Sequence, residues 1–553
     1  MSVEKLIVDH METWTSALQT RSTAGRGSSG KIDLYGIKKL RELILELAVR
    51  GKLVPQDPND KPASDLLKRI AAEKAELVKQ GKIKKQKPLP EISEEEKPFE
   101  LPEGWEWVHL PDIYCSISES SRKIKSSEIL PEGKYPVIEQ SQEFISGYCN
   151  NECLLIKLNN PVIVFGDHTR NIKFIDFDFV VGADGVKILS PILICERFFF
   201  WQLRSFKLDV RGYARHFKVL NSCLFALPPI AEQERIVEKV SSLMSLCDQL
   251  EQQSLTSLDA HQQLVETLLG TLTDSQNTAE LAENWARISE HFDTLFTTEA
   301  SVDALKQTIL QLAVMGKLVP QDPNDEPASE LLKRIAQEKA QLVKEGKIKK
   351  QKPLPPISDE EKPFELPEGW EWCRIGNIVN IKSELVSPKD YLNLYQVAPD
   401  IIEKGTGRVI SKRTVKESGV KGPNSRFYKG QIVYSKIRPS LSKVFLAEYN
   451  GLCSADMYPL DCYINPNYLL KYILSIPFLM QVKKAENRIK MPKLNSDSFY
   501  NIIVAIPPYN EQQAIFDKIN SIEAVCNGLI SYIGIYHKTQ LHLADALTDA
   551  AIN

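Results

Sequence analysis

The sequence lacks any long apolar run. No segment approaches the roughly 18 consecutive apolar residues of a membrane-spanning helix, so none is predicted. The first residues, MSVEKLIVDHMETW, place acidic side chains inside their apolar stretch. That pattern indicates an amphipathic helix and not a secretion signal. We therefore expect a cytoplasmic protein.

The cysteines show no pairing in sequence. The ten cysteines include no Cys-x-x-Cys motif. Cys149 and Cys153 lie four residues apart, but no second pair or His-x-x-x-His motif lies nearby to complete a zinc site. Free thiols in a reducing compartment are the expected state.

Motifs for catalysis are also missing. There is no GxxxxGK[ST] phosphate loop, no glycine-rich cofactor turn after a strand, and no Ser/His/Asp or Cys/His set among the eight histidines. The IPPY segment at Ile506–Tyr509 has Ile where amino-methyltransferases place Asn or Asp, and its sister copy is LPPI. The Glu-x-Lys triplets at Glu95–Lys97 and Glu360–Lys362 lie in a proline-rich arm without the strand of a nuclease core. We expect a non-catalytic chain with no cofactor or metal of its own.

What the sequence does contain is a long internal repeat. Leu40–Trp107 recurs at Leu305–Trp372 with scattered, mostly conservative changes, and Leu227–Val240 is echoed at Ile506–Ile519. Between these echoes the two copies differ. The centre of the chain has both kinds of repeat, while each end has one kind, so the two ends together make a second copy of the centre. The repeat predicts a closed framework with pseudo-two-fold symmetry that holds two different inserts.

The framework is predicted to be helical. Apolar residues recur at alternating spacings of four and three, which is typical of a coiled coil, and the two cysteines of this seam are best interpreted as small core residues. The seam consists of Ile236, Val240, Leu243, Cys247, Leu250, Leu264 and Leu268 in the first copy, and of Ile515, Ile519, Ile522, Cys526, Leu529, Ile533, Tyr536, Leu543 and Leu547 in the second. A helix over Ile236–Leu268 would be about 50 Å long at 1.5 Å per residue. The polar interruption at Ser254, Ser257 and His261 either fixes the register or contacts a partner.

A second kind of helix and an extended arm belong to the strong repeat. Ser64 and Ser329 are predicted N-caps, and Gly81 and Gly346 are predicted to end the helices that follow. The segment after each glycine is too rich in proline for a helix. It is predicted to be an extended arm that ends in a Trp-x-Trp anchor, formed by Trp105 and Trp107 in one copy and by Trp370 and Trp372 in the other.

The inserts carry the positive charge. Residues 371–505 contain 20 Lys/Arg against 11 Asp/Glu, while residues 105–225 contain 14 of each, although the whole chain has a net charge of -3. Such a charge favours polyanion binding or is ordinary solvated surface. Short β-type runs and turns predict an α+β fold, with two α/β domains separated by a long antiparallel coiled-coil framework. The predicted boundaries are 1–100 for the first helices and arm, 101–229 and 366–507 for the inserts, 230–365 for the central helical spacer, and 508–553 for the C-terminal coiled-coil helix.

Loops and basic segments of the inserts are the candidate binding elements. The turn Gly166–Arg170 is either a groove-probing loop or an ordinary polar hairpin. The equivalent segments Arg211–Ser222 and Glu486–Ser496 are both basic, which favours phosphate contacts. YSKIRPSL, which contains Tyr434, is a weaker candidate. The candidate DNA-binding residues are Thr169, Arg170, Arg211, Tyr213, Arg215, Lys218, Lys436, Arg438, Arg488, Lys490 and Lys493.

The arrangement resembles the specificity subunit of type I restriction–modification enzymes. The resemblance covers essentially the whole chain and is carried by the PP-x-x-EQ segments at Pro228–Gln233 and Pro507–Gln512, by the duplicated LAVxGKLVPQDPND and LPEGWEW, and by the two dissimilar inserts. It implies that each insert recognises one half of a bipartite double-stranded DNA target, with target-recognition domains held apart by helices. It also implies two modification (methyltransferase) subunits and restriction subunits as partners, with S-adenosylmethionine, ATP and Mg held by those partners.

Two other functions remain open. A self-contained DNA methyltransferase or nuclease with fused recognition domains predicts S-adenosylmethionine binding by the isolated chain. A purely structural coiled-coil adaptor predicts no DNA affinity in complex with a methyltransferase, and it leaves the basic inserts without a role.

Overall fold

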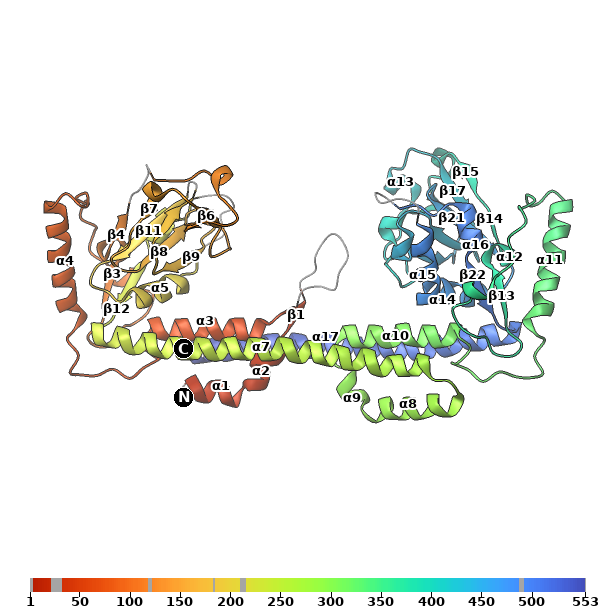
Figure 1. Ribbon diagram of the computed structural model, residues 1–553, viewed down its shortest axis with the longest axis horizontal. Coiled ribbons are helices and arrows are strands. Elements are labelled where there is room, and N and C mark those ends of the chain that lie inside the picture. Colours follow the sequence, from red (N-terminus) through yellow and green to blue (C-terminus); the bar gives the residue numbers. More distant parts are fainter. Residues whose placement is uncertain are drawn as a thin grey trace. The chain divides into compact units, whose positions relative to one another are not determined.

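The structure, a computed structural model, describes residues 3–20, 32–117, 122–182, 185–208, 215–486 and 492–552. The chain divides into two compact units (Figure 1). Unit 1 contains Met1–Ser257 and Tyr536–Asn553, and unit 2 contains Leu258–Ile535. Each unit combines helices with β-sheets, which confirms the predicted mixed fold class. The division falls inside two long helices that the predicted boundaries left whole.

The helices of unit 1 belong to its framework and to the first insert. They are α1 (Val3–Asp9), α2 (Met11–Ser16), α3 (Tyr35–Val49), α4 (Ala63–Lys79), α5 (Glu196–Ser205) and α6 (Phe217–Asn221), with the first part of α7 (Ile230–Asp274) and the last part of α17 (Tyr509–Ile552). In α3 the buried residues Ile37, Leu40, Ile44 and Leu47 follow the three- and four-residue spacing of one helix face. Helix α3 packs against α5, which belongs to the first insert.

The first insert contains most strands of unit 1. A two-stranded sheet pairs β3 (Glu106–His109) with β12 (Leu224–Leu227) where the insert leaves and rejoins the framework. One four-stranded antiparallel sheet has the order β4 (Tyr114–Ile117), β11 (Val186–Pro191), β8 (Val162–Gly166), β9 (Ile172–Ile175). The other has the order β6 (Gly147–Cys149), β5 (Tyr135–Ile138), β10 (Phe179–Val181), β7 (Leu155–Ile156). Outside the insert, β1 (Gln19–Thr20) pairs with β2 (Ile32–Asp33).

Unit 2 repeats this plan. Its helices are α8 (Thr278–Glu290), α9 (Phe292–Leu295), α10 (Glu299–Val314), α11 (Ala328–Lys344), α12 (Ile375–Ile378), α13 (Val415–Ser418), α14 (Pro466–Leu474), α15 (Ile476–Ala485) and α16 (Ser496–Asn501), with the remaining parts of α7 and α17. Its sheets are β13 (Glu371–Arg374) with β22 (Ile503–Ile506); β14 (Val379–Ile381), β21 (Met457–Cys462), β18 (Ile432–Ser435), β19 (Val444–Leu446); and β15 (Glu384–Val386), β17 (Asn424–Phe427), β20 (Gly451–Ser454), β16 (Tyr395–Val397).

The two inserts share the topology of the sheet that carries the hairpin, which their sequences do not reveal. In each, a short strand pair closes the insert, and one four-stranded antiparallel sheet has its last two strands joined as a hairpin, β8–β9 or β18–β19. The second four-stranded sheet of each insert contains one parallel pair, β5 with β10 or β16 with β20. The central hairpin strand β8 is buried along its whole length, as is β18. Equivalent loops therefore occupy equivalent places in both inserts.

Most of the predicted seam is buried, with three exceptions. Ile236, Val240, Leu243, Cys247 and Leu250 are buried, as are Ile515, Ile519, Cys526 and Ile533, whereas Leu268, Ile522, Leu529 and Leu547 are half-buried. The placement of Leu264, Tyr536 and Leu543 in the seam is wrong, because these side chains are 51%, 38% and 41% exposed. A straight α-helix drifts by about 20° per heptad against a strict seven-residue repeat. Val265 and Ala544 are accordingly buried instead.

The starts and ends of α4 and α11 test the predicted caps. Gly81 and Gly346 end these helices as predicted, with φ of 69° and 70° in the left-handed region. The predicted N-caps Ser64 and Ser329 are wrong, because the helices begin two residues earlier than such caps require, after Pro62 and Pro327. The first amide of each helix, that of Ala63 or Ala328, donates to the carbonyl of Gly104 or Gly369 at 2.8 Å. A backbone carbonyl from a distant segment thus accepts a hydrogen bond from the helix N-terminus, where a serine side chain was expected to accept it.

Candidate nucleic-acid interface

Hairpin loop 1 (residues 166–171) joins β8 to β9 in the first insert. Arg170 has a φ of 62°, and its amide donates to the carbonyl of Gly166 at 2.8 Å. The Thr169 hydroxyl is exposed but donates to the carbonyl of Gln140 at 2.5 Å. The Arg170 guanidinium donates through Nη1 to the carbonyl of Leu208 at 2.8 Å. Both candidate side chains therefore also shape the loop.

Asp167 connects hairpin loop 1 to the basic segment of the first insert. Its carboxylate, 4% exposed as a residue, accepts a hydrogen bond from the amide of Phe217 at 2.8 Å. Its backbone carbonyl accepts from the amide of His216 at 2.8 Å, and His216 Nδ1 lies 3.1 Å from the same oxygen. Arg170 and Asp167 thus hold the chain at residues 208 and 216–217, on either side of the predicted Arg211 and Tyr213, which lie outside the described residues. Arg215 and Lys218, which are described, are exposed.

Hairpin loop 2 (residues 435–443) joins β18 to β19 in the second insert and makes the same kind of connection. The amide of Arg438 donates to the carbonyl of Pro492, and the amide of Leu494 donates to the carbonyl of Lys436, both at 2.9 Å. The Glu486 carboxylate accepts from the amide of Ser440 at 3.0 Å. The basic segment of this insert is therefore held at both ends against the loop. Arg488 and Lys490, predicted contacts within that segment, lie outside the described residues.

The backbone of both loops is held in an uncommon conformation. Among the described residues, four non-glycine residues have a positive φ. Three of them, Arg170, Arg438 and Ser442, lie in the two hairpin loops. A left-handed non-glycine residue costs about 1–3 kcal/mol, and such residues cluster at functional sites. Each hairpin loop thus has an arginine in this uncommon conformation, although the two inserts differ in sequence.

The charged side chains of hairpin loop 2 differ in their availability. Lys436 donates through Nζ to the carbonyl of Ala455 at 2.7 Å and is 17% exposed as a side chain. Burial, with the nearby Lys493 as second cause, lowers the pKa of Lys436. Lys493 pairs with Asp456 at 3.0 Å and is 43% exposed. Arg438 is exposed and has no side-chain partner within the described part of the chain, so its guanidinium is the one most available to a ligand.

Comparison with known proteins gives these loops a context. Residues 102–260 and 367–533 match the family model described as type I restriction modification DNA specificity domain. Over the full length of both chains, this chain is 51% identical to the type I restriction enzyme EcoAI specificity subunit and 48% identical to the EcoEI specificity subunit, both from Escherichia coli. The HsdS subunit from Thermoanaerobacter tengcongensis is similar at 15% identity and a TM-score of 0.36, over 83% of this chain and 98% of that one.

The chain belongs to the type I restriction modification DNA specificity family. The resemblance drawn from PP-x-x-EQ and the duplicated segments is confirmed. Both matched regions contain a hairpin loop and its basic segment, so each of the two family domains carries one copy of the candidate interface.

Some residues that shape the candidate interface were not among the predicted DNA-binding residues. Asp167, Glu486 and Asp456 organise the loops through backbone and ion-pair contacts. The sequence signal for Asp167 was weak, namely an acid at the start of a polar turn. In the second insert, Arg426 lies over the rings of Tyr391 and Tyr428 at 5.3 and 4.9 Å, and its contact with Tyr391 joins residues that are distant in sequence.

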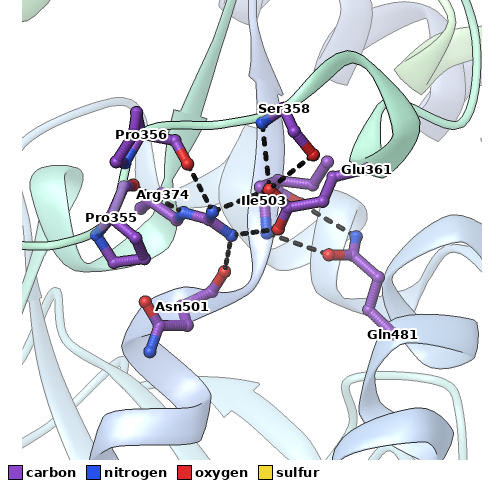
Figure 2. Close-up of polar contacts among 8 residues, drawn as sticks. All are labelled: Pro355, Pro356, Ser358, Glu361, Arg374, Gln481, Asn501 and Ile503. Carbon is purple, nitrogen blue, oxygen red and sulfur yellow. Dashed lines mark hydrogen bonds and ion pairs between the residues drawn. The ribbon is translucent and has the colours of Figure 1, made fainter.

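The extended arm of this specificity-family chain is fixed to the second insert by Arg374 (Figure 2). Its guanidinium donates to the carbonyls of Pro355, Pro356 and Asn501, and pairs with both oxygens of Glu361 at 2.7 and 3.0 Å. The bond from Arg374 is the largest cause that lowers the pKa of Glu361. The first copy has His109 at this position, and its Nε2 lies 2.9 Å from the carbonyl of Pro90. Glu361, part of a Glu-x-Lys triplet, thus has a structural ion pair.

Within the described residues, no three His, Cys, Asp or Glu side chains come close enough to hold a metal ion. No helix of that same part of the chain has the length and apolar character needed to cross a membrane.

Proposed function

We propose that the chain is the DNA-specificity subunit of a type I restriction–modification complex. Family membership over the whole chain, including 51% identity to a named specificity subunit, is the observation that carries this function. The role of such a subunit is recognition, not catalysis. The hairpin loops and their basic segments support a DNA contact in each insert, because they combine exposed cationic side chains with a held backbone.

Each insert recognises one half of a bipartite target. The inserts share the topology of the sheet that carries the hairpin loop but differ in sequence, whereas the framework that carries them is repeated. A shared topology keeps the loop in place, and a different loop sequence presents different donors and acceptors to base edges. Arg438 and Arg215 are the preferred contacts, since both are exposed. Thr169, Arg170 and Lys436 have a loop-shaping role in addition.

The helical framework fixes the spacer and binds the other subunits. Helix α7 is one continuous helix of 45 residues, about 68 Å at 1.5 Å per residue. Two modification (N6-adenine methyltransferase) subunits and the restriction subunits are the proposed partners, in the cytoplasm. S-adenosylmethionine, ATP and Mg are proposed to be held by these subunits and not by this chain.

Mapping the methylated adenines tests the function directly. The chain is co-expressed with its modification subunit, and the methylated adenines of the host DNA are located by sequencing. We expect one bipartite motif with a fixed spacer. Exchange of residues 105–225 for the corresponding insert of another specificity subunit should change one half of the motif only. A change in both halves, or methylation without a bipartite motif, would contradict the proposal.

The self-contained enzyme is tested on the isolated chain. S-adenosylmethionine binding by the chain without its partners, measured by calorimetry, would favour that alternative. The specificity subunit predicts no binding.

A further inference from the structure

The Glu-Gln pair of each PP-x-x-EQ segment forms a buried joint at the start of its long helix. Glu232 and Gln233 lie in the first turn of α7, and Glu511 and Gln512 lie in the first turn of α17. As residues they are 1%, 0%, 4% and 0% exposed. Four buried polar side chains at helix starts need partners, because an unpaired buried polar group costs about 1–3 kcal/mol.

The glutamate connects the helix to the first strand of the insert and to the framework. Glu232 accepts from Trp105 Nε1 at 2.9 Å and from Gln56 Nε2 at 3.1 Å. In unit 2, Glu511 accepts from Trp370 Nε1 at 2.9 Å and from Gln321 Nε2 at 3.2 Å. Burial raises the pKa of both glutamates. These tryptophans are the first residues of the predicted Trp-x-Trp anchors. Each anchor therefore binds the glutamate carboxylate of its long helix.

The glutamine connects the same helix to the far end of the insert. The amide of Cys195, the N-cap of α5, donates to Gln233 Oε1 at 3.0 Å, and Gln233 Nε2 donates to the carbonyl of Pro228 at 3.0 Å. In unit 2, the amide of Asn465, the N-cap of α14, donates to Gln512 Oε1 at 2.9 Å, and Gln512 Nε2 donates to the carbonyl of Pro507 at 3.1 Å.

The glutamine lies on a short route to the hairpin loops. Helix α5 packs on β9, and α14 packs on β19, so each helix supports the second strand of its own hairpin. The long helix is thus connected to the candidate DNA loop through the glutamine, the short helix that it binds, and the hairpin strand on which that helix packs. Any rotation of the insert about its connections to the long helix has to break the bond at Cys195 or Asn465.

Neighbouring contacts show that the joint is not a mere result of the repeat. Arg235 pairs with Asp60 through Nη2 at 2.6 Å in unit 1. The second copy has Ala514 at that place, and Asp325 accepts from Asn510 at 2.8 Å instead. These neighbouring contacts have therefore diverged between the copies, whereas the hydrogen bonds of the buried joint keep their lengths to within 0.1 Å.

We propose that Gln233 and Gln512 are positioning residues that set the orientation of each insert on its long helix, and thereby the spacer length that the complex accepts. The inference rests on the proposed function, since it assigns to the joint the spacing of two half-sites. Neither glutamine contacts DNA in this scheme. Their effect is on spacing and not on the sequence recognised in either half.

The test uses the complete methyltransferase complex with Gln233→Ala. Methylation rates are measured on DNA with the native spacer, on DNA with the spacer one base pair longer or shorter, and on DNA with one base changed in a half-site. We expect the preference for the native spacer to fall about tenfold, which corresponds to the loss of about one hydrogen bond, while discrimination against the half-site change is kept. Gln512→Ala should behave alike.

A second variant removes the same bond from its other end. Cys195→Pro deletes the amide donor at a residue whose φ of -59° suits proline. It should lower the spacer preference like Gln233→Ala, and the double variant should add little. Gln252→Ala, an exposed glutamine of α7, is the matched control and should retain the wild-type preference.

The outcomes separate the joint from the proposed function. A merely structural glutamine would lower all rates and the melting temperature in proportion, leaving the spacer preference unchanged, and that result would overturn the inference. If Gln233→Ala does not fold, the spacer preference of Cys195→Pro tests the inference in the same way. Wild-type complex without any bipartite preference would instead refute the proposed function.

Discussion

Arg438 offers two variants that separate the strain of its backbone from the DNA contact of its side chain. Its backbone has a φ of 46°, and its guanidinium is exposed without a partner among the described residues. Arg438→Ala removes the guanidinium and keeps the backbone strain. Arg438→Gly removes the guanidinium and the strain together. If Arg438 contacts DNA, both variants lose that contact equally, and only the glycine variant becomes more stable than the alanine variant.

The magnitudes follow from the loop geometry. A left-handed non-glycine residue costs about 1–3 kcal/mol, and glycine costs about 0.5–1 kcal/mol in unfolded-chain entropy. Arg438→Gly should therefore be about 1 kcal/mol more stable than Arg438→Ala. In a unit of this size that difference raises Tm by about 2–4 °C. Because the exposed guanidinium makes no internal contact in the described structure, Arg438→Ala itself should unfold close to the wild type.

The DNA measurement is the salt dependence of binding by the methyltransferase complex. Loss of one phosphate contact lowers the slope of log K against log salt by about 0.9. Loss of a base contact instead costs about 1–3 kcal/mol and relaxes one position of the second half-site. Leu193→Gly, at the one non-glycine residue with a positive φ that the structure describes outside the loops, is the control and should gain stability with unchanged DNA binding. Unchanged binding in both Arg438 variants would refute a DNA role for this arginine.

Three further predictions follow from other parts of the chain. Arg374→Met should lower the free energy of unfolding by about 2–3 kcal/mol, as measured by thermal unfolding. The loss is smaller than for a fully buried ion pair, because Glu361 is 41% exposed. No change in Tm would contradict the stabilising role of this ion pair. Burial lowers the pKa of Lys339 from 10.5 to about 8, so between these pH values the unfolded chain holds a proton that the folded chain releases, and this residue makes stability rise with pH. In Lys339→Met, Tm measured between pH 8 and 10.5 should lack this rise of stability with pH. A pH profile of Tm identical to that of the wild type would contradict the prediction. Insertion of seven residues in both α7 and α17 adds about 10 Å of helix. It should lengthen the DNA spacer by about three base pairs at 3.4 Å each, with both half-sites kept. A changed half-site in methylated-adenine mapping would refute the proposal that the helical framework fixes the spacer.

Patterns with a short range were predictable from the sequence. Gly81 and Gly346 end their helices because the left-handed turn there suits glycine, a property that is local. The seam cysteines Cys247 and Cys526 are buried as small core residues, since their spacing places them on the apolar helix face. The internal repeat and its PP-x-x-EQ segments indicated the family without any structure.

Features that depend on residues distant in sequence were not predictable. The partner of Ala63 is the carbonyl of Gly104, so a serine cap is unnecessary. Leu264 and Leu543 face outward because helix geometry drifts from the seven-residue repeat, which a spacing pattern does not record. The common topology of the two inserts is hidden because buried strands require apolar residues of suitable size, not particular ones.

The sequence by itself determined that this protein duplicates a helical framework around two different inserts, because repetition and periodicity are written along the chain. Only the tertiary structure decided that hairpin loop and basic segment meet in each insert, since hydrogen bonds such as those of Asp167 and Arg438 join segments 50 residues apart or more. It also decided why Glu and Gln follow the paired prolines. Their partners, Trp105 and Cys195 in one copy and Trp370 and Asn465 in the other, become neighbours only when the insert folds back onto its long helix.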